Sequence, residues 1–210
     1  MIAIIDYGAG NLGSVQKAFE FLGAPCAVTS SARDMLSADA LVLPGVGAFG
    51  DCMRQLSARG LPDVIREFIS SGRPFLGICL GMQLLFEGSE ESGGVEGLCV
   101  LKGSVRRFPE ASGLKVPHIG YNSVIPPAGS RLFASLPEEL YYYFVHSYYC
   151  SCETAGALTA KTEYGIPFNA ALEYRNISAA QFHPEKSGAL GIRTLQNFIG
   201  IINYNVNGGV

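Results

Sequence analysis

The 210-residue sequence contains no tryptophan, only three histidines and little charge of either sign. Lys and Arg number 15 against 18 Asp and Glu, so there is no basic surplus to neutralise a nucleic-acid backbone. A long hydrophobic run is also missing. The most apolar stretch, Phe75 to Phe86, is shorter than the ~20 residues of a membrane span and contains two glycines and a Gln. We therefore expect neither nucleic-acid binding nor a membrane segment.

The other compositional features favour one cytoplasmic domain. The start MIAIIDYG has no basic segment and reaches Asp6 before a signal peptide could form. In such a chain, six cysteines are expected to be reduced thiols rather than a disulfide framework. We expect a single domain over residues 1–210. Charged residues make up 16%, below the roughly 25% of an average domain, which suggests that another protein covers some uncharged surface.

Strand-like and helix-like patterns alternate through the first part of the chain. Four apolar runs are typical of buried strands: Met1–Asp6, Cys26–Thr29, Ala40–Leu43 and Arg73–Ile78. Helical patterns follow near Asn11 and after Pro62, short β-like runs with turns dominate after Gly88, and a final helix is expected from about Ser187. These patterns predict an α/β fold of flavodoxin-like type: an open, mostly parallel central sheet flanked by helices, with β-hairpins in the second half.

The segment PFLGICLGMQLLF has the pattern of a nucleophile elbow with Cys79 as the reactive residue. Gly77 and Gly81 flank it because side chains there would clash where a strand turns sharply into a helix. The helix N-terminus would favour the thiolate, and the N–H of Leu80 would point at the oxygen of a tetrahedral intermediate. The alternative is a buried structural cysteine between tight-turn glycines.

The segment QFHPEKS supplies a base for such a nucleophile. His183 and Glu185 leave the same side of an extended chain, and Pro184 fixes its own φ and biases His183 toward extended values. A carboxylate beside an imidazole selects its tautomer and stabilises the imidazolium. The alternative is a surface His beside a solvated Glu. His118 and His146 have no carboxylate two residues away.

Two glycine-rich loops and one cluster admit other interpretations. LVLPGVGAFG follows a strand and could bring backbone N–H groups to a substrate or be an ordinary turn. GAGNLG fits a dinucleotide fingerprint, but Asp34 lies beyond the second strand, where the acidic residue of the fingerprint should end it. His146, Cys150 and Cys152 could be imagined as metal ligands, although no second pair has zinc spacing. We predict neither a metal nor a cofactor. The charged loop EGSEESGGVEG is interpreted as a solvated turn.

Cys79 followed by His183-Pro184-Glu185 resembles the triad-type glutamine amidotransferases. The segments IIDYGAGNLGSV, LPGVGAFGDCM, GICLGMQLLF, VPHIGYN, YFVHSYY and QFHPEKS are together similar to the amidotransferase subunits of imidazole glycerol phosphate synthases. This resemblance implies that L-glutamine is hydrolysed to glutamate and ammonia through a γ-glutamyl thioester on Cys79, with His183 as general base and acid and Glu185 as the orienting carboxylate.

The resemblance also assigns the surroundings of the triad and a partner. It implies Val46 and Leu80 as oxyanion donors, and Gly47, Gln83, Ser147 and Tyr148 as glutamine-binding residues. The ammonia would pass to a separate cyclase subunit, a (β/α)₈ barrel, in a heterodimer that makes imidazole glycerol phosphate in histidine biosynthesis. The contact face would include Asn11, Tyr121, Tyr143 and Lys186.

One departure keeps other interpretations open. The family usually has Trp where this chain has Tyr121, which leaves an amidotransferase subunit for a different acceptor synthase, such as a sugar-modifying one, as an alternative. From another class, a non-catalytic binding module would have the same fold. The intact Cys79, His183 and Glu185 favour the enzyme.

Overall fold

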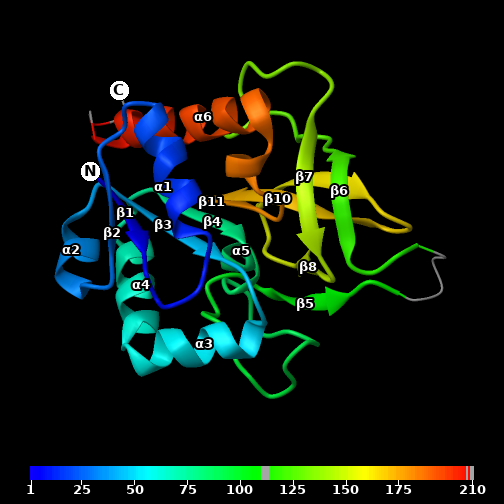
Figure 1. The fold of residues 1–210 in the computed structure, drawn as a ribbon, viewed down its shortest axis with the longest axis horizontal. Helices are drawn as coiled ribbons and strands as arrows, with labels where there is room; N and C mark the ends of the chain where they lie inside the picture. Colours follow the sequence, from blue (N-terminus) through cyan, green and yellow to red (C-terminus); the bar gives the residue numbers. More distant parts are fainter. Residues whose placement is uncertain (110–113, 207, 209–210) are drawn as a thin grey trace.

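A computed structural model of the chain describes residues 1–109, 114–206 and 208 (Figure 1). Its first part alternates strands and helices, as the sequence predicts. The elements are β1 (Ile2–Ile5), α1 (Leu12–Phe21), β2 (Cys26–Thr29), α2 (Ala32–Ser37), β3 (Ala40–Gly45), α3 (Phe49–Ala58), α4 (Leu61–Ser70), β4 (Phe75–Cys79) and α5 (Leu80–Gln83).

The second part is mostly β-structure and ends in a long helix. Its elements are β5 (Gly103–Arg107), β6 (His118–Ser123), β7 (Tyr141–His146), β8 (Tyr148–Cys152), β9 (Leu158–Glu163), β10 (Pro167–Tyr174), β11 (Ile177–Ala180), the 3₁₀ turn η2 (Pro184–Lys186) and α6 (Gly188–Val206). No helix in the described part of the chain is long and apolar enough to cross a membrane.

The described strands form one large mixed sheet and one small sheet. The large sheet has the order β2-β1-β3-β4-β11-β10-β8-β5, with β9 added on β10, and β6 pairs separately with β7. The five strands from β2 to β11 are parallel, and β10, β8, β5 and β9 are antiparallel to their neighbours. The predicted α/β class with a mostly parallel central sheet is confirmed.

Three details differ from the sequence prediction. Helices α2 and α3 were not predicted, since α2 has only six residues and α3 begins directly after a glycine-rich loop. The aromatic run YYYFVHSYY is divided at Ser147 between two sheets. Strand β11 pairs with β10 as in a hairpin, and it also pairs in parallel with β4 in the middle of the large sheet.

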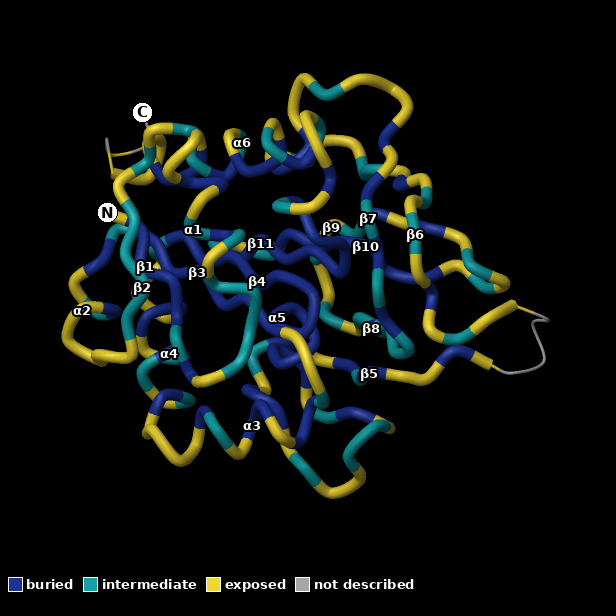
Figure 2. Tube along the Cα trace, in the orientation of Figure 1, coloured by how far each residue is buried: buried dark blue, intermediate teal, exposed yellow. Residues whose placement is uncertain are grey.

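The two faces of the sheet carry separate apolar cores. Ile2 and Ile4 pack with residues of α1 and α6 on one face, whereas Ala3 and Ile5 pack with residues of α2, α3 and α4 on the other. This alternation follows from the period of two in a strand. The central strands β1, β3, β4 and β11 are accordingly buried and the outer helix faces exposed (Figure 2).

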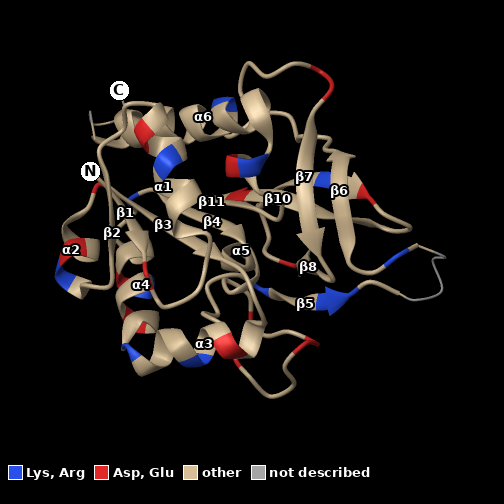
Figure 3. Ribbon diagram, in the orientation of Figure 1, with Lys and Arg blue, Asp and Glu red and all other residues tan. Residues whose placement is uncertain are grey.

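The arrangement of the strands brings distant segments to one edge of the sheet. The carboxyl ends of β1, β3, β4 and β11 lead into the segments that carry Asn11, Gly47, Cys79 and His183. Open α/β sheets bind their ligands at this edge. Acidic and basic residues are interspersed in the view of Figure 3.

Candidate active site

Cys79 lies at a sharp turn between β4 and α5, in a backbone conformation that L-residues rarely adopt. Its φ is 54° and its ψ is −109°. A Cβ on Gly81 would lie 1.8 Å from the Leu43 carbonyl oxygen, and one on Gly77 would lie 2.8 Å from the Gly81 carbonyl oxygen. Both glycines are therefore required by close backbone packing, and the strained conformation holds the thiol clear of the turn.

The helix after Cys79 is shorter than a helix-dipole argument assumes. Helix α5 has four residues, Leu80–Gln83, so few peptide dipoles are aligned behind the thiol. A side-chain donor contributes instead: Gln181 Nε2 donates to Cys79 Sγ at 3.7 Å. Gln83 Nε2 holds Gln181 by donating to its Oε1 at 3.0 Å. These contacts place a buried hydrogen-bond donor against the sulfur.

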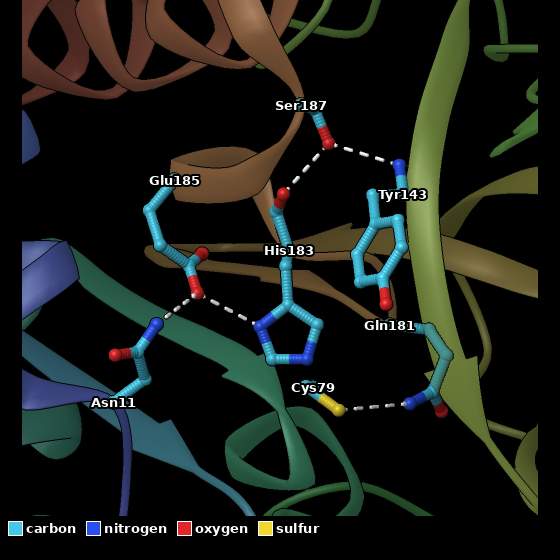
Figure 4. A network of polar contacts seen from close by, with 7 residues as sticks. All are labelled: Asn11, Cys79, Tyr143, Gln181, His183, Glu185 and Ser187. Atoms are coloured by element: carbon cyan, nitrogen blue, oxygen red, sulfur yellow. Dashed lines mark hydrogen bonds and ion pairs between the residues drawn. The ribbon is translucent and has the colours of Figure 1, made fainter. Parts of the chain in front are cut away.

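Gln181 was missed by the sequence analysis. A signal existed, because the sequence pattern reads as extended as far as His183, and residues two apart in an extended chain share one side. In the structure β11 ends at Ala180 and the chain bends at Gln181; both side chains lie next to Cys79 in Figure 4, and both residues are buried.

His183 lies between Glu185 and Cys79 (Figure 4). Its Nδ1 is 2.8 Å from Glu185 Oε1, which also accepts a hydrogen bond from Asn11 Nδ2 at 3.3 Å. Nε2 has no well-aligned hydrogen bond to a described residue and lies at the ring edge on the Cys79 side. Burial lowers the pKa of His183, but hydrogen bonding and attraction from Cys79 and Glu185 outweigh it and raise this pKa to about 10. The imidazolium is thus the stable form at neutral pH.

Strand β7 fixes the backbone of His183. The His183 N–H donates to the Tyr143 carbonyl at 2.9 Å. Ser187 Oγ donates to the His183 carbonyl at 2.6 Å and accepts from the Tyr143 N–H at 3.0 Å. The imidazole is therefore positioned by neighbours on both its side chain and its main chain.

A cavity of about 350 Å³ opens at the sulfur. Its lining contains all six residues expected to hold glutamine and its oxyanion, namely Val46, Gly47, Leu80, Gln83, Ser147 and Tyr148. Glu91, Pro117, Val145 and His146 line it as well. Gly47 has a φ of 107°, which favours glycine there, and Val46 is half exposed.

The sequence pattern predicts a solvated turn for the acidic loop beside this cavity, but two of its side chains are hydrogen-bonded to the start of α3. Glu91 Oε2 accepts a hydrogen bond from the Phe49 N–H at 2.7 Å, and Ser92 Oγ accepts one from the Gly50 N–H at 3.0 Å. These side chains satisfy free backbone donors at the start of α3. The loop is therefore fixed, and it brings Glu91 to the cavity wall.

The four residues expected at a partner interface lie together beside the triad. Tyr121 Oη donates to the Lys186 carbonyl at 3.0 Å, and its ring centroid is 5.8 Å from that of Tyr143. Lys186 Nζ lies 6.0 Å from the Tyr143 ring centroid, and Asn11 bonds Glu185. Tyr121 is 60% exposed, so its ring is available to another protein.

The metal cluster and the dinucleotide loop that the sequence admits can both be compared with the structure. In the described part of the chain, no three His, Cys, Asp or Glu residues are grouped to hold a metal ion. His146 bonds His118 and the Tyr148 carbonyl. In the GAGNLG loop, a Cβ on Gly13 would meet nothing within 4 Å. The third glycine of a dinucleotide fingerprint is needed for close packing, and no such packing occurs here.

Comparisons with known proteins agree on one family. The family model "Glutamine amidotransferase class-I" matches residues 3–201. Imidazole glycerol phosphate synthase subunit HisH of Moorella thermoacetica is 48% identical over 99% of this chain and 98% of its own length. The HisH subunit of Methanothermobacter thermautotrophicus is 50% identical over 96% of this chain and 99% of its own length.

Solved structures support the fold. A crystal structure of a glutamine amidotransferase matches with a TM-score of 0.75 at 16% identity, covering 97% of this chain and 100% of that one. PurLQS from Thermotoga maritima matches with a TM-score of 0.70 at 16% identity, covering 95% of this chain and 97% of that one.

Proposed function

The chain belongs to the class-I glutamine amidotransferase family, and we propose that it is the glutaminase subunit of an imidazole glycerol phosphate synthase in histidine biosynthesis. The family match and the near-complete coverage of HisH relatives support this function. The observation that carries the chemistry is His183, held between Glu185 and Cys79 at the wall of a cavity.

In the first half-reaction, the Cys79 thiolate attacks the side-chain amide carbon of glutamine. The N–H of Leu80 stabilises the oxyanion that forms, because the first N–H groups of a helix have no acceptor within the helix. The N–H of Val46, in the loop across the cavity, is the second donor. His183, protonated at rest, gives its Nε2 proton to the leaving nitrogen, and ammonia departs from a γ-glutamyl thioester.

In the second half-reaction, water replaces ammonia. Neutral His183 takes a proton from the water, hydroxide adds to the thioester carbon, and Cys79 leaves as thiolate with glutamate as the product. Glu185 keeps Nδ1 of the ring hydrogen-bonded through both steps, so that Nε2 remains the atom that exchanges protons.

The cavity wall has groups for both ends of glutamine. Glu91 is the carboxylate among the lining residues, and the Phe49 N–H bonds its Oε2. Its other oxygen can pair with the α-ammonium group. Gln83, Gly47, Ser147 and Tyr148 enclose the rest of the substrate.

Ammonia is consumed by a second polypeptide. We infer that this partner is a cyclase subunit with a (β/α)₈-barrel fold, bound in a heterodimer over Asn11, Tyr121, Tyr143 and Lys186. The grouping of these residues beside the triad supports this inference. We place the complex in the cytoplasm, where cysteines stay reduced; all six cysteines of this chain are free.

A Cys79→Ser variant tests the nucleophile. Hydrolysis of glutamine should fall by at least about 10³-fold, because a hydroxyl ionises far less readily than a thiol and is a weaker nucleophile. The affinity for the cyclase, measured by calorimetry, should be unchanged. Cys99→Ser is the matched control, since Cys99 is exposed and outside the cavity lining. Wild-type turnover in Cys79→Ser would contradict the mechanism.

The acceptor is tested separately. With the cyclase subunit and its ribulosyl substrate, glutamine-dependent formation of imidazole glycerol phosphate is expected. Product formation with a sugar-modifying synthase instead would favour the alternative acceptor and leave the glutaminase assignment intact.

A further inference from the structure

Two histidines outside the triad form a buried pair behind the glutamine cavity. His118 on β6 lies opposite His146 on β7, and His118 Nδ1 is 3.0 Å from His146 Nε2. Both residues are buried, at 3% and 6% exposure. The His118 ring stacks on Tyr164 with centroids 4.0 Å apart, so the pair is embedded among aromatic side chains.

The hydrogen bonds at one end of the pair define its proton positions. The Asn122 amide NH₂ donates to the Glu163 carbonyl at 2.9 Å, and its Oδ1 accepts from the Ser123 N–H at 2.8 Å. The amide orientation is therefore determined. The same NH₂ lies 3.2 Å from His118 Nε2, which must accept, so a neutral His118 carries its proton on Nδ1 and donates to His146.

The hydrogen bond at the His146 end of the pair independently gives the same direction of donation. His146 Nδ1 is 2.8 Å from the Tyr148 carbonyl oxygen, which can only accept. His146 therefore carries its proton on Nδ1 and accepts from His118 at Nε2. The chain of donors runs from Asn122 through both rings to Tyr148 without a conflict. Every ring nitrogen of the pair is thus satisfied by one tautomer of each histidine.

The acceptor at the end of this chain belongs to the glutamine cavity. The Tyr148 carbonyl also accepts from Gln83 Nε2 at 3.0 Å, and Gln83 in turn holds Gln181 against Cys79. His146 itself lines the cavity with Ser147 and Tyr148. Two buried donors therefore fix one carbonyl, and with it the short segment between β7 and β8 that encloses the substrate.

We propose that His118 and His146 are positioning residues, which act as a neutral donor relay to hold the Ser147–Tyr148 segment in its glutamine-binding conformation. The proposal rests on the proposed function, because it assigns this segment to glutamine. Burial agrees with the neutral state: it lowers the pKa of His118 to about 4. Burial also lowers the pKa of His146 to about 3, with repulsion from His118 and His183 adding to it against the bond to Tyr148.

A spectroscopic measurement tests the relay without relying on activity. The chain has three histidines, so ¹⁵N-histidine labelling gives a spectrum that single substitutions can assign. At pH 7, His118 and His146 should each show a protonated Nδ1 and a bare Nε2, whereas His183 should show two protonated nitrogens. An Nε2–H tautomer or an imidazolium at either member of the pair would overturn the proposal.

A kinetic measurement tests the role in positioning. In the complex with the cyclase, His146→Phe should raise the KM for glutamine about tenfold and change kcat by less than threefold. His146→Asn should recover most of this loss, because an asparagine amide can donate from the position of Nδ1 to the Tyr148 carbonyl. Tyr164→Phe is the control: it keeps the ring stacked on His118 and removes only the bond to the Lys115 carbonyl.

The possible outcomes are distinguishable. A wild-type complex that hydrolyses glutamine while His146→Phe keeps the wild-type KM overturns the positioning role alone. A wild-type complex that is no more active on glutamine than Cys79→Ser overturns the proposed function, and the positioning role with it.

Discussion

The charge of His183 is stabilised by the two other groups of the triad. Glu185 and Cys79 are anionic when ionised and lie on opposite sides of the His183 ring, so the imidazolium is favoured despite its burial. The folded-state pKa of about 10 lies above the ordinary histidine value of about 6.5. Stability from this group is therefore fully present below pH 6.5 and is lost as the pH rises towards 10.

This charge state gives a testable titration. The ¹⁵N signals of His183 should show two protonated nitrogens at pH 8 and should titrate near pH 10. Glu185→Gln should lower the pKa of His183, because it removes one of the two negative charges beside the ring. Asp63→Asn is the control, because Asp63 is paired with Arg66 on the exposed side of α4. A wild-type His183 that titrates below pH 7 would contradict its protonated resting state.

At the residue scale, the sequence was informative where neighbours in the chain are neighbours in the site. Cys79 between its glycines could be predicted because the motif itself creates its geometry. His183 and Glu185 could be predicted because they are close in the chain, although Glu185 lies in the 3₁₀ turn η2 and not in the extended segment that the sequence predicted. The spacing of Gln181 and His183 was a local signal, but the contact of Gln181 with the sulfur also depends on the pairing of β11 with β4. Glu91 comes to the cavity because it caps a helix that begins 42 residues earlier. Local patterns carry little information on contacts of this kind.

At the scale of elements, the turn after β4 determines where the sulfur stands. The glycine spacing predicts this turn because each glycine faces backbone atoms of a neighbouring segment. The position of β11 between β4 and β10 could not be predicted from the sequence, because a four-residue strand pattern gives no signal for its pairing partners. The segment that follows β11 in this position contains His183.

Gly81→Ala tests the packing of this turn. A Cβ there would lie 1.8 Å from the Leu43 carbonyl oxygen, so the turn must shift or the fold must weaken. We expect a loss of several kcal/mol in the free energy of unfolding, measured with denaturant, and loss of glutaminase activity. Gly13→Ala in α1 is the control, because it meets nothing within 4 Å and should change stability by about 1 kcal/mol or less. Equal stabilities would show that the turn is not tightly packed.

At the scale of the whole molecule, the exposed aromatic ring of Tyr121 marks the proposed docking face. The sequence predicted a covered surface from its low charge, and the resemblance supplied the partner and the residues. The sequence departs from the resemblance at Tyr121, where the family usually has tryptophan. The structure shows that this ring is exposed, and that its hydroxyl bonds the Lys186 carbonyl next to the triad.

Tyr121→Ala tests this face. Its Kd for the cyclase subunit, measured by calorimetry, should rise about tenfold, since large aromatic side chains dominate interface energies. Tyr121→Trp should keep the wild-type affinity. Tyr204→Ala removes a ring of similar exposure, 58%, from the far end of α6 and should have no effect. Equal losses for Tyr121→Ala and Tyr204→Ala would place the interface elsewhere.

The most direct test of the account labels the nucleophile with a substrate mimic. A diazoketone analogue of glutamine alkylates a thiolate within a glutamine site with loss of N₂, and peptide mass spectrometry locates the adduct. Among six cysteines, we expect one adduct per chain, on Cys79, with protection by glutamine and none in Cys79→Ser. An adduct on another cysteine, or labelling that glutamine does not reduce, would contradict the assignment of Cys79 as the residue that attacks the amide.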